Sequence, residues 1–180
     1  MDLQIAKARD CDLDEIVLLY DELNDYLAAN ANGPGWRKGV YPTRVEVEHF
    51  HGTDALYVAK LDGEIAGSFA LTYEHEKDPD NGRWQIEAGD DEVFVVHIFA
   101  VHPKFLRRGV GSAMLKFADE LAVERGLKAI RLDVYDQNLP AIRTYERNGY
   151  RYIDTVDLGL GHYGLDWFRL YEKVLAPAQI

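Results

Sequence analysis

The stretch VFVVHIFAVHPKFLRRGVGSAMLKFADELAVER, residues 93–125, decides how the rest of the chain is interpreted. Its first nine residues contain one polar side chain, His97, which is typical of a strand covered on both faces. Residues 102–108 then carry three cations directly ahead of a Gly-Val-Gly sequence. From Val110, apolar residues recur at helical spacing as far as Gly126, which favours a helix end. The stretch therefore predicts a strand, a basic glycine loop and a helix.

Such a loop is suited to an anion. Unpaired N–H groups and the positive end of the helix dipole meet at the first helical turn, and glycines let a ligand approach the backbone closely. The loop is not a Walker A sequence, because no Lys-Ser or Lys-Thr pair follows Gly109, and Met114 replaces the third glycine of a dinucleotide fingerprint. The alternative is an ordinary turn that uses glycine only for close packing.

A second pattern follows the predicted strand 128–135. Asn138 is a plausible helix N-cap, and Asn148-Gly149 ends the short helix. With both pieces in view, the chain resembles the GNAT superfamily of acyl-CoA-dependent N-acetyltransferases. Residues 106–111 match that family's [QR]xxGx[GA] loop, with Leu106 as a departure. The family's NxxAxxxYxxxGF pattern is matched by Asn138, Ala141, Tyr145, Gly149 and Tyr150.

The resemblance implies acetyl-CoA as co-substrate, with no metal. The backbone of Phe99 and Val101 would hold the pantetheine arm, and Asn138 would orient it from the other side. The pyrophosphate would lie on the basic loop, formed by Arg107, Arg108, Gly109, Val110, Gly111 and Ser112. An amine would attack the thioester directly, so the reaction needs a base for the ammonium and an acid for the leaving thiolate.

By resemblance, Tyr145 is the general acid; the alternative is a tyrosine that packs the short helix on the sheet. His97 is the candidate base, since an imidazole accepts a proton near neutral pH. Strand alternation predicts that His97 shares a face with Phe99 and Val101. The alternatives for His97 are a core histidine and a water chain that ends on a carboxylate such as Glu87.

The remaining elements predict an α/β architecture in one domain, residues 1–180. Helices are expected near 12–29, where Asp12 and Glu15 fit a capping box, and near 43–51. Asp62-Gly63 predicts a hairpin between strands 55–61 and 64–73. Strands are also expected at 3–9, 150–158 and 167–174. Together with the parallel pair 93–101 and 128–135, they give a mostly antiparallel mixed sheet with helices on both faces, as the GNAT fold has.

Composition excludes several classes of partner. The 180 residues carry a net charge of −11, which argues against general affinity for nucleic acid or anionic membrane. No apolar run approaches a membrane span, and the N-terminus has acids where a signal peptide has an apolar core. Cys11 is the single cysteine, so no intrachain disulfide is possible. We expect a cytoplasmic protein.

The acceptor is the open question. We expect a small-molecule primary amine; a protein or peptide acceptor and a non-catalytic CoA-binding module are the alternatives. Loops around Trp36, Trp84 and Tyr163 are the candidate acceptor-binding segments. The acidic stretch Glu74–Glu92 is either a solvated connection or a rim that attracts a protonated amine. Resemblance also allows a homodimer.

Overall fold

The computed structural model describes residues 2–31, 33–73 and 84–176, which form two compact units. Unit 1 comprises residues up to 31 together with 36–71 and 97–117. Unit 2 comprises 33–35, 72–73, 84–96 and 118–176. The strand β4 (Val93–Val101) and the helix α3 (Val110–Glu124) each have residues in both units. That residues 1–180 form one domain stays a prediction.

Seven strands and four α-helices make up the described chain. The strands are β1 (Leu3–Lys7), β2 (Leu56–Leu61), β3 (Glu64–Thr72), β4 (Val93–Val101), β5 (Ala129–Tyr135), β6 (Arg151–Val156) and β7 (Phe168–Val174). The helices are α1 (Leu13–Ala29), α2 (Arg44–Gly52), α3 (Val110–Glu124) and α4 (Leu139–Arg147). Short 3₁₀ turns include η1 (Asp10–Asp12), η3 (Pro103–Phe105) and η4 (Gly161–Tyr163).

The sheet confirms the predicted fold class. Its strands are hydrogen-bonded in the order β1-β2-β3-β4-β5-β7-β6. β4 and β5 are parallel, as predicted, and their pairing covers Val93–Val95 against Ala129–Arg131. The position of β7 between β5 and β6 was not predicted, because strand order depends on long-range packing that local patterns do not encode.

Local turn chemistry behaves as the sequence predicts. Asp62 and Gly63 both have positive φ, 51° and 88°, as a two-residue hairpin turn that follows the twist of its strands requires. At the end of α3, Gly126 has φ 71°, and its N–H donates to the carbonyl of Val123. The N–H of Leu127 donates to Ala122, which completes a Schellman end.

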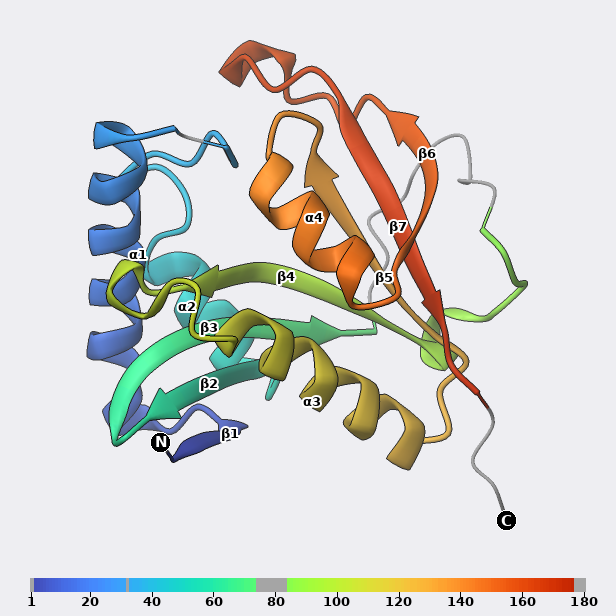
Figure 1. Ribbon diagram of the computed structural model, residues 1–180, viewed down its shortest axis with the longest axis horizontal. Helices are drawn as coiled ribbons and strands as arrows, with labels where there is room; N and C mark the ends of the chain where they lie inside the picture. The colour runs from blue at the N-terminus through green and yellow to red at the C-terminus, as the bar shows by residue number, and fades with distance from the viewer. Residues whose placement is uncertain (1, 32, 74–83, 177–180) are drawn as a thin grey trace. The chain divides into compact units, whose positions relative to one another are not determined.

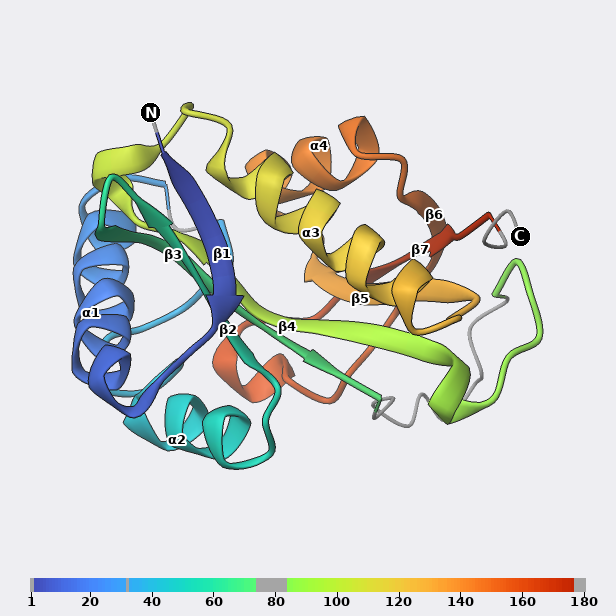
Figure 2. The ribbon, with the colours of Figure 1, turned by 90° about the horizontal axis from the view of Figure 1, so that it is seen from below.

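In unit 1, two layers cover the strands. α1 and α2 lie over one face, and the first part of α3 lies over the other (Figure 2). The α1/α2 side is an apolar cluster that includes Ile16, Tyr20, Val47, Leu56, Val58, Ile98 and Ala100. On the α3 side, Phe117 contacts the rings of Tyr57 and Phe69 at 5.4 and 6.3 Å between centroids. Both faces of the central strands are therefore buried.

In unit 2, α4 lies beside β5 and β7 (Figure 1), and a buried ion pair joins these two strands. Arg131 Nε donates to Glu172 Oε1 at 2.8 Å, and both side chains are almost fully buried. The N–H of Gln85 donates to Glu172 Oε2, and the ring of Trp84 covers the Arg131 guanidinium at 4.2 Å. Trp84 therefore packs on the sheet. Most of the acidic stretch, residues 74–83, lies outside the described residues.

The start of α1 corrects one prediction. Asp12 is the N-cap by position, but its side chain does not cap α1. Its carboxylate instead accepts from the N–H of Arg9 at 2.9 Å and from Lys60 Nζ at 2.5 Å. The nearby Lys60 in β2 therefore outcompetes the helix N–H groups for this carboxylate. Among the described residues, no helix has both the length and the apolar character to cross a membrane.

Replacing Asp12 should make stability less dependent on pH. Burial by itself raises the pKa of Asp12, but hydrogen bonds from Lys60 and Arg9 overcome it and lower the pKa from 3.8 to about 2. The carboxylate thus stabilises the fold above pH ~4, and this stabilisation disappears as the pH falls toward ~2. We expect Asp12→Asn to lower the unfolding free energy by about 2 kcal/mol at pH 7, with the difference vanishing near pH 2.

Urea unfolding between pH 2 and 7 measures this effect. Asp14→Asn is the matched control, because the Asp14 side chain is 88% exposed and its ion pair with Arg44 lies at the surface. It should change stability by less than about 0.5 kcal/mol. A pH-independent loss in Asp12→Asn would contradict the prediction.

Candidate active site

The basic loop of unit 1 connects β4 to α3 through two left-handed residues. Arg107 has φ 60° and Gly109 has φ 80°, so the chain turns sharply into the helix. The N–H of Ala113 donates to the carbonyl of Gly109 at 3.0 Å, which starts the helical ladder there. The first turn of α3 therefore directs the positive end of the helix dipole toward the loop.

Packing alone requires neither glycine of the loop. A Cβ on Gly109 would meet nothing within 4 Å, so glycine is favoured there only by its positive φ. A Cβ on Gly111 would lie 3.6 Å from Val101 and 3.7 Å from Phe99, which is ordinary contact. The alternative of a glycine turn built for close packing therefore has no support at these positions, and the space that a Cβ on Gly109 would enter is open.

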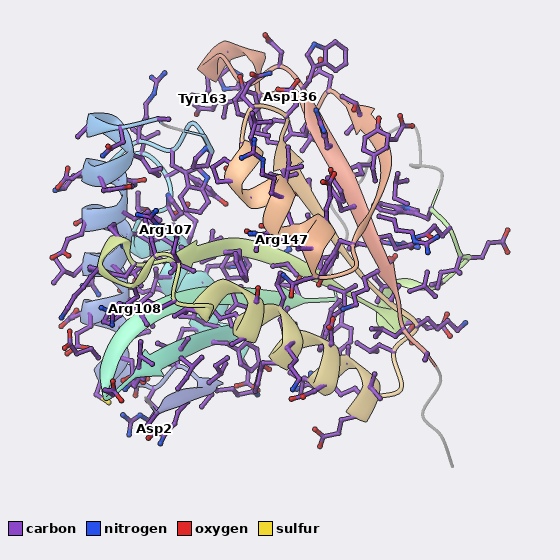
Figure 3. All side chains as sticks on the ribbon, viewed as in Figure 1. Asp2, Arg107, Arg108, Asp136, Arg147 and Tyr163 are labelled. Atoms are coloured by element: carbon purple, nitrogen blue, oxygen red, sulfur yellow. The ribbon has the colours of Figure 1, made fainter. Side chains whose placement is uncertain are left out.

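The charge of the loop is carried by two arginines at its tip. Arg107 and Arg108 project from the chain just before α3 (Figure 3). The Arg108 guanidinium lies 5.6 Å from the ring of Phe105. Within the described residues, neither arginine forms an ion pair with an acid. Both charges thus remain available to a phosphate-bearing ligand.

Strand β4 is irregular at Ile98, which has φ 43°, an uncommon conformation for a β-branched residue. The Tyr20 hydroxyl on α1 donates to the Ile98 carbonyl at 2.6 Å and holds it there. The Tyr20 side chain is fully buried, and its burial raises its pKa, so the phenol keeps its proton. The irregularity is therefore fixed by a buried hydrogen bond.

This break overturns the predicted alternation. His97 stacks on Phe50 of α2, with ring centroids 5.4 Å apart, and Phe50 packs against the cluster that contains Ile98. Phe99 and Val101 instead face Gly111 of α3. His97 thus lies on the opposite face from Phe99 and Val101, because the left-handed residue shifts the side-chain alternation by one position.

His97 is half-buried, and its surroundings weaken it as a base. Burial of the imidazole, followed by the charge of His49, lowers the pKa of His97 from 6.5 to about 4. At neutral pH the ring is therefore unprotonated and can accept a proton. It gives up that proton more easily than an exposed histidine does.

Tyr145 belongs to unit 2, where α4 buries it against the sheet. Its ring lies 5.9 Å from Tyr150 and 6.5 Å from Tyr171. Burial raises the pKa of Tyr145, and the carboxylate of Asp133 on β5 raises it further. The phenol remains a proton donor throughout the physiological range. Asp133 was not among the residues predicted for the site, although a carboxylate in an otherwise largely apolar strand is a signal that could have marked it.

Asn138 precedes α4 in the same unit. Its carbonyl accepts from the N–H of Ile142 at 3.0 Å, but its side chain does not cap the helix. Gly33 lies so close that a Cβ there would be 2.7 Å from Asn138 Oδ1. Asn138 is thus the N-cap of α4 by position, as predicted, but its side-chain amide lies beside the glycine-rich segment 33–35 and does not cap the helix.

The candidate acceptor loops differ in their packing. Trp36 lies edge-on to Tyr20 and Tyr41, at 6.2 and 6.0 Å, so this loop is pinned to the core of unit 1. Tyr163 is 48% exposed and contacts the ring of His162 at 4.0 Å. Figure 3 places Tyr163 and Asp136 near the same end of unit 2.

The predicted residues therefore fall into two groups. Unit 1 holds the residues expected to bind the cofactor's pantetheine and pyrophosphate, together with His97. Unit 2 brings together Tyr145 and Asn138 through α4, with Asp133 on β5. The described residues contain no cluster of three His, Cys, Asp or Glu side chains that could hold a metal ion.

Solved structures with the same fold come from bacteria and archaea. A GNAT-family acetyltransferase from Streptococcus agalactiae superposes with a TM-score of 0.81 at 23% identity, over 97% of this chain and 96% of that one. The ribosomal-protein-S18-alanine N-acetyltransferase of Escherichia coli gives 0.68 at 16%, over 99% and 97%. Ard1 from Thermoplasma volcanium gives 0.71 at 17%, over 98% and 100%.

The sequence itself matches a family model as well as a fold. The acetyltransferase (GNAT) family model matches residues 17–150. This range covers the basic loop, both parallel strands and the helix that carries Tyr145. The protein therefore belongs to the acetyltransferase (GNAT) family.

Proposed function

We propose that this acetyltransferase moves the acetyl group of acetyl-CoA to the primary amine of a small molecule. Family membership makes it an acyltransferase that acts on an amine acceptor. The observation that supports the choice of donor is the loop from Arg107 to Ser112. It joins two left-handed residues, the start of helix α3 and two arginines without acidic partners among the described residues.

In this proposal the loop binds the pyrophosphate of acetyl-CoA. Backbone N–H groups of the first turn of α3 donate to the phosphate oxygens, and Arg107 and Arg108 supply charge. The backbone of Phe99 and Val101 holds the pantetheine arm, and Asn138 orients it, as the family resemblance implies.

The amine nitrogen attacks the thioester carbonyl, and a C–N bond forms as the C–S bond breaks. His97 accepts the proton that the nitrogen loses. Tyr145 donates its proton toward the sulfur as negative charge develops there. A raised pKa keeps Tyr145 protonated and a lowered pKa keeps His97 unprotonated, so both groups are in the required form at neutral pH.

A protein or peptide acceptor is the second candidate, because one structural relative is named for an alanine of ribosomal protein S18. Trp36 packs against Tyr20 and Tyr41, so its loop is held against the core of unit 1. We take this packing to favour a small-molecule acceptor over a peptide. Release of free thiol from acetyl-CoA, measured with pooled small amines and with pooled peptides, separates the two.

Gly111 lies in the first turn of α3, where the pyrophosphate binds in this proposal. A carboxylate in the first helical turn is compatible with the helix dipole, but it repels a pyrophosphate. Gly111→Asp should therefore fold normally and lose the rise in melting temperature that acetyl-CoA gives the wild type. At 100 times its Kd, acetyl-CoA should stabilise the wild type by about 2.7 kcal/mol.

Gly111→Ala is the control, because its Cβ makes only ordinary contacts. It should keep the acetyl-CoA shift. Equal shifts in the Asp and Ala variants would place the cofactor elsewhere, and no shift in the wild type would refute acetyl-CoA as the donor.

Removing the Tyr145 hydroxyl should separate chemistry from binding. The phenol acts on charge that appears in the transition state, whereas the ring continues to pack on Tyr150 and Tyr171. We expect Tyr145→Phe to lower kcat by roughly two to four orders of magnitude, with a less than threefold change in acetyl-CoA Kd. Steady-state kinetics and calorimetry measure the two quantities. Parallel losses in both would make Tyr145 a structural residue.

The pH profile tests His97. If it is the base, kcat/KM should fall as the pH drops through about 4, because protonated His97 cannot accept the ammonium proton. His97→Gln should remove this limb and lower kcat/KM by roughly two to four orders of magnitude. The assay needs a weakly basic amine, so that titration of the acceptor stays outside the window.

Thermal melts at each pH keep acid unfolding apart from loss of the base. If His97→Gln retained both the limb and the rate, His97 would be a core residue. A carboxylate, for example Glu87 through water, would then replace it as the base.

A further inference from the structure

We infer that His102 and Glu22 are positioning residues that fix the start of the basic loop and thereby set the affinity for acetyl-CoA. This inference rests on the proposed function, because it takes the loop from Arg107 to Ser112 as the pyrophosphate site. Both residues lie in unit 1, His102 directly after β4 and Glu22 on α1.

His102 is bonded through its backbone and through both ring nitrogens. Its N–H donates to the Ala66 carbonyl of β3 at 2.9 Å. Its Nδ1 accepts from the N–H of Lys104 at 3.1 Å, which caps η3. Its Nε2 lies 2.7 Å from Glu22 Oε2. One imidazole thus joins the loop backbone to α1.

The partners determine which nitrogen carries the proton. A backbone N–H can only donate, so Nδ1 must be the acceptor, and the proton of the neutral ring lies on Nε2. This Nε2–H can then donate to the Glu22 carboxylate. The hydrogen bond to a charged acceptor is stronger than one between neutral groups, and the His102 side chain is only 19% exposed.

The rest of the loop is built on this cap. Phe105, the last residue of η3, is 5% exposed, and its N–H donates to the His102 carbonyl at 2.9 Å. The rings of His102 and Phe105 meet edge to face at 5.9 Å. The Arg108 guanidinium lies over the same Phe105 ring. The direction of Arg108 therefore depends on η3, and η3 depends on His102.

The basic residues of the loop differ in whether they pair with an acidic side chain. Glu22 pairs with His102, and Glu64 of β3 pairs with Lys104. In the part of the chain that the structure describes, Arg107 and Arg108 have no such acid. His102 and Lys104 thus anchor the loop, and the two arginines are left to contact phosphate.

An anchored loop lowers the cost of binding, because the ligand need not order it. Removing the link to α1 should weaken acetyl-CoA binding by roughly tenfold, the effect of one hydrogen bond to a charged group. The chemical step should be unaffected once acetyl-CoA is bound, since neither His102 nor Glu22 contacts the reacting atoms in this proposal.

The experiment measures acetyl-CoA Kd and KM, kcat and the KM for the amine in a series of variants of the full chain. His102→Asn keeps a side-chain oxygen to cap η3 and loses the link to Glu22. Glu22→Ala loses the same link from the other side. Each should raise acetyl-CoA Kd and KM by roughly tenfold, with kcat and the amine KM unchanged. Because both remove one interaction, the double variant should be no worse than either single variant.

Two further variants sharpen the test. Glu22→Gln retains an acceptor oxygen without the charge, so it should recover part of the affinity that Glu22→Ala loses. The double variant His51→Asn/Asp10→Ala removes another histidine–carboxylate pair, also at 2.7 Å, that does not touch the loop. It should leave acetyl-CoA Kd unchanged, whatever its effect on the melting temperature.

Lower melting temperatures with wild-type Kd in His102→Asn and Glu22→Ala would overturn the inference and leave the pair a purely structural contact. Additive losses in the double variant would also overturn it. Failure of the proposed function looks different, because wild-type protein would then not bind acetyl-CoA at all. If wild type binds, Gly111→Asp does not and the His102 series matches wild type, only the positioning role is refuted.

Discussion

The hydrogen bond from the Tyr20 hydroxyl to the Ile98 carbonyl is the interaction on which the central strand depends. A β-branched residue at positive φ costs about 1–3 kcal/mol and persists only where its surroundings impose it. Here a fully buried phenol and an apolar cluster do so. The result is a strand that directs His97 toward α2 and Phe99 toward α3, and so separates a candidate proton acceptor from the residues beside the basic loop.

The charged groups of the basic loop have two roles: some anchor the loop, and others are left to contact a ligand. Glu22 and Glu64 hold its first half to α1 and β3, and the second half carries Arg107 and Arg108 into an open surface. An acidic protein can in this way retain a local site for an anion. The net charge of −11 says little about this loop, because binding there depends on the few charges and N–H groups within a hydrogen bond of the ligand.

Unit 2 is stabilised by a buried ion pair as well as by apolar packing. Arg131 and Glu172 are buried as a pair, and each has a further backbone partner in the segment 85–86. Removing one partner would leave an uncompensated charge, at a cost of about 3–5 kcal/mol. The pair therefore ties a connecting segment to β5 and β7. Tyr145 is buried in the same unit, which keeps its phenol protonated for the acid role proposed here.

The sequence by itself determined the features that neighbouring residues decide. Asp62-Gly63 sets its hairpin through two residues that tolerate positive φ, and Gly126 ends α3 for the same reason. The glycine loop with its arginines and the helix that carries Tyr145 also follow from local pattern, so the family and the candidate cofactor residues could be identified before any coordinates.

Tertiary structure decided the rest, because the partners are distant in the chain. The conformation of Ile98 is held by a hydrogen bond from Tyr20, 78 residues away in the sequence. No local sequence pattern predicts the resulting shift in the alternation of side chains along β4. The carboxylate of Asp12 was expected to cap α1, but it accepts a hydrogen bond from Lys60 instead. The burial that lowers the pKa of His97 and the contact of the Trp84 ring with the Arg131 guanidinium likewise arise only when separate elements pack. Local chemistry therefore set the elements, and long-range packing set the direction and proton affinity of the side chains on them.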